Sequence, residues 1–101
     1  MASQVLISNL SDDDSKLAPY ELVVEYIADA GGLEVVIEYN GIAVAAQDAS
    51  QTSGSLSFSL NYLNSTIGET VRAVLRVKAA PNTLVDTDTR TGLSFETDSP
   101  P

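Results

Sequence analysis

The dipeptide Asn40-Gly41 stands between two runs of alternating apolar and polar residues, and this arrangement constrains the fold more than any other feature. A two-residue type I′ turn needs positive φ at both central residues, and Asn-Gly accepts that conformation best. The flanking runs carry apolar residues at every second position: Val35, Ile37 and Tyr39 before the turn, and Ile42, Val44 and Ala46 after it. The pattern predicts a β-hairpin within an antiparallel sheet.

Further segments show the same period-two alternation, which is typical of a strand with one buried and one solvated face. They cover residues 20–26, 55–61 and 69–79, and shorter apolar segments lie at residues 5–7 and at Leu93 and Phe95. Residues 47–54 and 83–91 are polar and are predicted to be connections. The sequence therefore predicts an all-β, antiparallel sandwich of about seven strands with Greek-key connections.

The predicted sandwich occupies residues 20–96 of a single domain. An N-terminal arm, residues 1–19, holds the short first strand and an acidic loop, and a flexible Pro-ended tail covers residues 97–101. The opening residues have no signal-peptide pattern, and no apolar stretch approaches the length of a membrane span. From the start at Met1 we expect a complete product made in the cytoplasm, and a domain cut from a larger protein is the alternative.

Charge and composition exclude several classes of function. Fourteen acidic residues against five basic ones give a net charge of −9, which argues against nucleic-acid binding and against an anionic membrane surface. The chain has no His and no Cys. Disulfides, Cys/His zinc sites and Ser-His-Asp or Cys-His catalysis are therefore ruled out. We expect no cofactor, and we expect that the protein is not an enzyme.

Two acidic clusters have the oxygen ligands that Ca²⁺ prefers. Asp12, Asp13 and Asp14 form one cluster, and Asp86 and Asp88 form the other. Neither cluster has the spacing of an EF-hand loop with its distal Glu. We interpret both as solvated acidic loops, and we predict no metal site.

Paired carboxylates are the other candidate for chemistry, since glycoside hydrolysis needs two of them about 5–10 Å apart. Glu21 and Glu25, and likewise Glu34 and Glu38, are four residues apart on predicted strands, which places them about 13 Å apart. That distance is too long for the reaction. We assign no catalytic residue.

The basic residues are better explained by pairing across strands. If residues 33–39 and 69–79 are antiparallel neighbours, Glu34 and Glu38 face basic side chains on the outer surface. The candidates are Arg72, Arg76 and Lys78. Opposite charges facing each other across strands stabilise a sheet by about 0.2–1 kcal/mol per pair.

Two further patterns have weak functional meaning. Asn9 and Asn64 begin sequences that match the N-glycosylation pattern, which without a signal peptide we attribute to chance. Exposed tyrosines could form a sugar-binding platform, but the first three are predicted to face the core. The tyrosines are Tyr20, Tyr26, Tyr39 and Tyr62.

Three segments together resemble an immunoglobulin-like or fibronectin type III-like domain. They are residues 33–44 with their Asn-Gly hairpin, residues 54–60 (GSLSFSL) and residues 67–77 (IGETVRAVLRV). The chain is similar to small Ig-like domains of bacterial surface proteins and of phage particles. The resemblance implies a tyrosine-corner role for Tyr62. The cysteine pair and the Trp of antibody domains are missing.

This resemblance implies a structural or interaction protein that decorates the exterior of a bacteriophage capsid. The implied partner is a capsid or other virion protein, and the implied location is the virion after synthesis in the host cytoplasm. The alternative is an adhesive or carbohydrate-binding Ig-like module of a surface or fibre protein. A second copy of the chain is a further candidate partner, through exchange of the short first strand.

Overall fold

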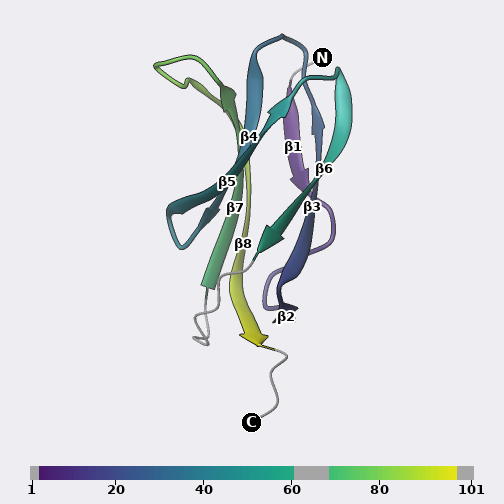
Figure 1. The fold of residues 1–101 in the computed structure, drawn as a ribbon, viewed down its shortest axis with the longest axis vertical. Helices are drawn as coiled ribbons and strands as arrows, with labels where there is room; N and C mark the ends of the chain where they lie inside the picture. The colour runs from purple at the N-terminus through teal and green to yellow at the C-terminus, as the bar shows by residue number, and fades with distance from the viewer. Residues whose placement is uncertain (1–2, 61–68, 98–101) are drawn as a thin grey trace.

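A computed structural model describes residues 3–60 and 69–97, and within these residues it contains eight β-strands and no helix. The strands form two sheets that face each other in an elongated sandwich (Figure 1). The all-β class and the two-sheet architecture are therefore confirmed. No helix among the described residues is long and apolar enough to cross a membrane.

The smaller sheet has three strands in the order β1-β3-β6. β1 (Gln4–Ile7) and β6 (Ser53–Leu60) both pair antiparallel with β3 (Tyr20–Ile27), which lies between them. Alternation along β3 turns the side chains of Leu22 and Val24 into the core.

The larger sheet has five strands in the order β2-β8-β7-β4-β5. Its central strands are β7 (Glu69–Val77), β4 (Leu33–Tyr39) and β8 (Leu84–Thr97), and β5 (Ile42–Ala49) forms one edge. The other edge is β2 (Ser15–Ala18), which pairs parallel with β8. The N-terminal segment thus contributes one strand to each sheet.

Apolar side chains from both sheets fill the space between them. The largest that are fully buried are Phe95, Ile7, Leu22, Ile37, Leu60, Leu75, Leu93, Val24, Val35 and Val71. The ring of Phe95 lies 6.1 Å from that of Tyr20 and 6.0 Å from that of Tyr39, centroid to centroid. The strand faces that the alternation predicts are therefore correct at Leu75 and at Phe58, which is 3% exposed.

The predicted hairpin is present between β4 and β5. Asn40 and Gly41 have φ values of 52° and 85°, as a type I′ turn requires, and Tyr39 pairs with Ile42. The register shifts between Ile37 and Glu38, which leaves an extra residue on β5.

Three sequence predictions about the strands are wrong. Residues 83–91 are not a connection, because β8 runs unbroken from Leu84 to Thr97. The predicted loop at residues 47–54 is shorter, because β5 continues to Ala49 and β6 begins at Ser53. The short strand β2 was not predicted, and the count is eight strands instead of about seven. The corner containing Tyr62 lies outside the described residues.

The length of β8 was hidden by a bulge at Gly92. Glu69 of β7 pairs with Leu93, whereas Val71 pairs with Arg90, so one extra residue interrupts β8 between these pairs. Gly92 has a φ of 68°, which favours glycine. The bulge changes the parity of the strand, and as a result Arg90 and Leu93 share the inner face.

Candidate interaction surface

The outer face of the three-stranded sheet is the candidate functional surface. Residues alternate along β3, so that Glu21, Val23, Glu25 and Ile27 point away from the core. Together with the outward residues of β1 and β6 they form what we call the acidic face: Gln4, Leu6, Glu21, Val23, Glu25, Ile27, Ser53, Ser55, Ser57 and Ser59.

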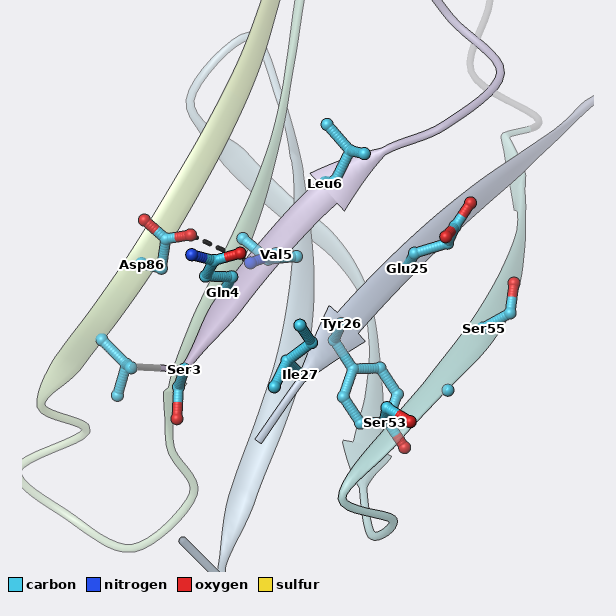
Figure 2. A pocket seen from close by; sticks show the side chains of 12 residues that line it. Ser3, Gln4, Val5, Leu6, Glu25, Tyr26, Ile27, Ser53, Ser55 and Asp86 are labelled. Atoms are coloured by element: carbon cyan, nitrogen blue, oxygen red, sulfur yellow. Dashed lines mark hydrogen bonds between the residues drawn. The ribbon is translucent and has the colours of Figure 1, made fainter. Parts of the chain in front are cut away.

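A shallow hollow of about 890 Å³ lies at one end of the acidic face, between β1, β3, β6 and the start of β8 (Figure 2). Its apolar members include Leu6 and Val85, which are 51% and 39% exposed, and the half-buried Ile27. Polar side chains surround them, among them Glu25 and Ser55. An apolar centre with a polar rim is the usual anatomy of a surface that binds another protein.

Side chains of β8 bind the backbone of β1 beside the hollow. In Figure 2 the carboxylate of Asp86 reaches the backbone of β1, where Oδ2 accepts a hydrogen bond from the Val5 amide at 2.9 Å. Two residues further along β8, Asp88 Oδ2 accepts from the Ile7 amide at 2.8 Å. Asp86 and Asp88 both reach β1, because residues two apart on a strand point to the same side, as do the amides of their partners Val5 and Ile7 on β1.

Arg90 completes this arrangement, which we call the carboxylate clasp (Asp86, Asp88 and Arg90). Its Nη2 donates to the Ile7 carbonyl at 2.9 Å, and its Nε donates to the Leu10 carbonyl at 2.7 Å. Nη1 also pairs with Asp88 Oδ1 at 2.8 Å. Three side chains of β8 therefore satisfy backbone groups along the outer edge of β1.

Charge distinguishes the two outer faces of the sandwich. The strands β1, β3 and β6 contain no Lys or Arg, and Glu21 and Glu25 form no ion pair with any described residue. The acidic face is therefore negative and has no internal counter-charge.

The outer face of the five-stranded sheet is neutralised internally. Arg76 lies 2.8 Å from Glu34, and Arg72 lies 3.5 Å from Glu38, as the cross-strand prediction requires. Lys78 pairs instead with Asp48 at 2.8 Å. The hydrogen bond and the charge of Asp48 raise the pKa of the Lys78 ammonium above its ordinary value. We call this the ion-paired face.

The acidic cluster at residues 12–14 lies in a turn with Asp12 and Asp13 exposed, as predicted, whereas the second cluster is not a solvated loop. Asp86 and Asp88 belong to β8 and bind β1, so this interpretation is wrong for them. In the first cluster, Asp12 Oδ1 accepts from the Thr91 amide and Asp14 Oδ2 from the Ser11 amide, both at 2.8 Å. Both clusters therefore bind the backbone, and no group of three His, Cys, Asp or Glu residues within residues 3–60 and 69–97 has the geometry of a metal site.

Two of the tyrosines face the core, as predicted. Tyr26 and Tyr39 are each 5% exposed, and Tyr20 is half-buried. Burial first, and then the charge of Asp14, raises the pKa of the Tyr20 hydroxyl. Gly54 faces the ring of Tyr26 so closely that an added Cβ would lie 3.0 Å from its hydroxyl. These rings offer no stacking platform for a sugar.

A buried pair, Tyr39 and Glu69, was not predicted. The Tyr39 hydroxyl donates to Glu69 Oε2, and Glu69 is 2% exposed. Burial, followed by this hydrogen bond, raises the pKa of Tyr39. The other oxygen, Oε1, has no hydrogen-bond partner among the described residues. Residues 61–68, which include Asn64 with its chance match to the N-glycosylation pattern, precede Glu69 and lie outside those residues.

No family model matches the chain, and no curated protein is similar enough to be counted as a relative.

Proposed function

We propose that this chain is a non-enzymatic interaction protein with an Ig-like sandwich. The strand order supports the Ig-like assignment. β3 and β6 correspond to strands B and E of an Ig sheet, and β8-β7-β4-β5 corresponds to strands G, F, C and C′ of the opposite sheet. The crossing of the chain between sheets after β3 and after β5 fits a Greek-key arrangement.

One observation carries the interaction role. The acidic face combines exposed apolar side chains around a hollow with carboxylates that have no internal counter-charge. The acidic face fits a protein surface that presents basic residues around an apolar side chain. Opposite charges speed the association of two such proteins, and the apolar contact slows their dissociation.

Within this class, the resemblance to small phage proteins favours one setting. We propose that the chain decorates the outside of a bacteriophage capsid and meets a capsid protein through the acidic face. The ion-paired face then points outward, and the net charge of −9 of the whole chain favours dispersed particles. The buried positions of Tyr26 and Tyr39 count against the alternative of a carbohydrate-binding module.

The first test is mass-spectrometric detection of the chain in purified phage particles from its source, with the soluble lysate measured alongside. Stoichiometric enrichment on particles is expected. Absence from particles contradicts the decoration role and leaves a glycan-array measurement to examine the alternative.

The second test addresses the surface. Leu6→Asp places a charge in the hollow and is expected to abolish cosedimentation of the recombinant chain with particles. Ile42→Asp is the matched control, because Ile42 is also exposed, at 67%, but lies at the β4–β5 turn. Equal loss of binding in both variants would contradict the assignment of the acidic face.

A further inference from the structure

The four edge strands of the two sheets differ in how their backbone is protected. An edge strand presents unpaired N–H and C=O groups, and proteins cover these with side chains, charges, bulges or Pro to prevent pairing with other chains. β1 is covered by the carboxylate clasp. β2 has only four residues, contains Lys16 and is followed by Pro19.

β5 is protected by its sequence and its shape. It contains the bulge opposite Ile37 and Glu38, and near its end it carries Asp48, which binds Lys78. A bulge twists an edge strand away from a regular ladder, and a charge at the edge repels the same charge on another copy.

β6 lacks a charge, a bulge and Pro, although the Gln47 side chain of β5 covers its Ser57 carbonyl. It has eight residues in unbroken register with β3, and it contains no charged residue and no Pro. The charge-free segment extends well beyond the strand, since no residue between positions 49 and 68 is charged. In a chain with a net charge of −9, this is the edge at which two copies can approach without bringing carboxylates together.

The backbone of β6 is oriented for pairing. The Gln47 side chain donates from Nε2 to the Ser57 carbonyl at 2.6 Å, so this carbonyl points away from β3. In an antiparallel strand the N–H and C=O of one residue point to the same side, and alternate residues repeat this direction. Ser55 and Ser57 therefore turn their backbone groups to the outer edge.

The side chains of this edge also lack cover. Leu56 packs against the core from β6 but is only partly buried, and so are Val44 and Ala45 on β5. A strand added to β6 places its own inward side chains next to Leu56 and removes apolar surface from water.

We propose that β6 pairs antiparallel with β6 of a second copy of this chain around a two-fold axis at Leu56. Leu56 of the two copies then face each other, and Ser55 of each lies opposite Ser57 of the other. The two three-stranded sheets become one six-stranded sheet, and the two acidic faces become continuous. The inference goes beyond the proposed function and does not depend on it.

A second copy fits this edge better than a different protein does. Two-fold pairing makes the surface its own complement, so each serine and leucine meets the same kinds of residue. A basic partner is drawn to the acidic face and not to a strand without charge.

The test is sedimentation equilibrium of the full chain from micromolar to millimolar concentration, at low and high salt. A monomer–dimer equilibrium is expected, and it strengthens with salt because salt screens the repulsion between two chains of charge −9. A chain that stays monomeric at high concentration and high salt overturns the proposal.

The variant Ser55→Lys/Ser57→Lys locates the interface. It places two lysines of each copy against two of the other, and like charges opposite each other across strands are destabilising, so we expect the dimer Kd to rise about tenfold or more. The control Ala43→Lys/Ala46→Lys adds two lysines at exposed positions of β5, the other long edge. Both variants change the net charge from −9 to −7.

The control is expected to dimerise at least as well as the unmodified chain, because it repels itself less. Loss of the dimer in the control, or its persistence in the β6 variant, overturns the proposal. Circular dichroism confirms that both variants are folded. Hydrogen exchange of the unmodified chain gives an independent check, since the Ser55 and Ser57 amides must gain protection as concentration rises. Unchanged exchange at both amides also overturns the proposal.

Discussion

Removing Asp88 tests how strongly β8 side chains hold the first strand. The Asp88 carboxylate makes two charge-assisted contacts, one with the Ile7 amide and one with Arg90, both at 2.8 Å. A hydrogen bond to a charged group contributes about 1.5–3 kcal/mol. Because the Asp88 side chain is 21% exposed, water replaces part of what is lost. We expect Asp88→Ala to lower the free energy of unfolding by about 2–4 kcal/mol.

The assay is urea unfolding followed by circular dichroism, together with amide hydrogen exchange of β1. Asp86→Ala is the graded comparison, since Asp86 accepts from the Val5 amide but has no ion pair among the described residues, and about 1–2 kcal/mol is expected. Asp48→Ala is the control, because the pair of Asp48 and Lys78 is exposed to water, and exposed ion pairs add little to stability.

The expected order of destabilisation is Asp88, then Asp86, then Asp48. Faster exchange at Ile7 is expected in the Asp88 variant, because its amide loses its acceptor. If Asp48→Ala costs as much as Asp88→Ala, or if the Ile7 amide remains protected, the clasp does not hold β1.

Three further outcomes follow from the core, the bulge and a buried hydroxyl. Leu75→Ala is expected to cost about 2–5 kcal/mol in urea unfolding, since Leu75 is fully buried, against about 0.5 kcal/mol for the exposed Ile42→Ala. Gly92→Ala is expected to cost about 1–3 kcal/mol, because φ is positive and the new Cβ would lie 2.1 Å from a carboxylate oxygen of the 12–14 loop, whereas Gly31→Ala meets nothing within 4 Å and is close to neutral. In the folded chain the pKa of Tyr39 lies above the ordinary value of 10.0, so on raising the pH the unfolded chain loses the hydroxyl proton first. The raised pKa therefore stabilises the fold below about pH 10, and this contribution is expected to be lost as the pH rises further. Tyr39→Phe should remove that part of the pH dependence in unfolding measured across the alkaline range.

The sequence predicts this fold well where local chemistry and burial agree. Asn40-Gly41 favours a single kind of turn, and the flanking residues alternate between a solvent-exposed face and the core. The hairpin and the pairing at its turn can therefore be predicted from the residues alone. The same alternation at residues 69–79 places Arg72 and Arg76 opposite the glutamates of β4, as observed.

The sequence misleads where a strand faces something other than apolar side chains. The inward residues of the first half of β8 are Asp86, Asp88 and Arg90, which contact the backbone of β1. Alternating Asp and Thr therefore suggest a polar connection. The bulge at Gly92 then shifts the alternation, so the two halves of β8 do not read as one strand.

The candidate surface is only partly visible in the sequence. That Glu21 and Glu25 face outward follows from alternation along residues 20–26, but their lack of counter-charge depends on strand order, which assigns every basic residue elsewhere. The hollow depends on the position of β1 beside β8, a contact between residues about 80 positions apart in the chain.

The carboxylate clasp has a consequence for how this protein can diversify. It recognises the main chain of β1 and is indifferent to the outward side chains, so Gln4 and Leu6 can change while the strand stays docked. Substitutions at these two positions are expected to alter the hollow directly while leaving the hydrogen bonds between β1 and β8 in place. If the acidic face binds a partner as proposed, exchanging the side chains at residues 4 and 6 is expected to change which partner the domain binds, while the backbone of β1 keeps its contacts with β8.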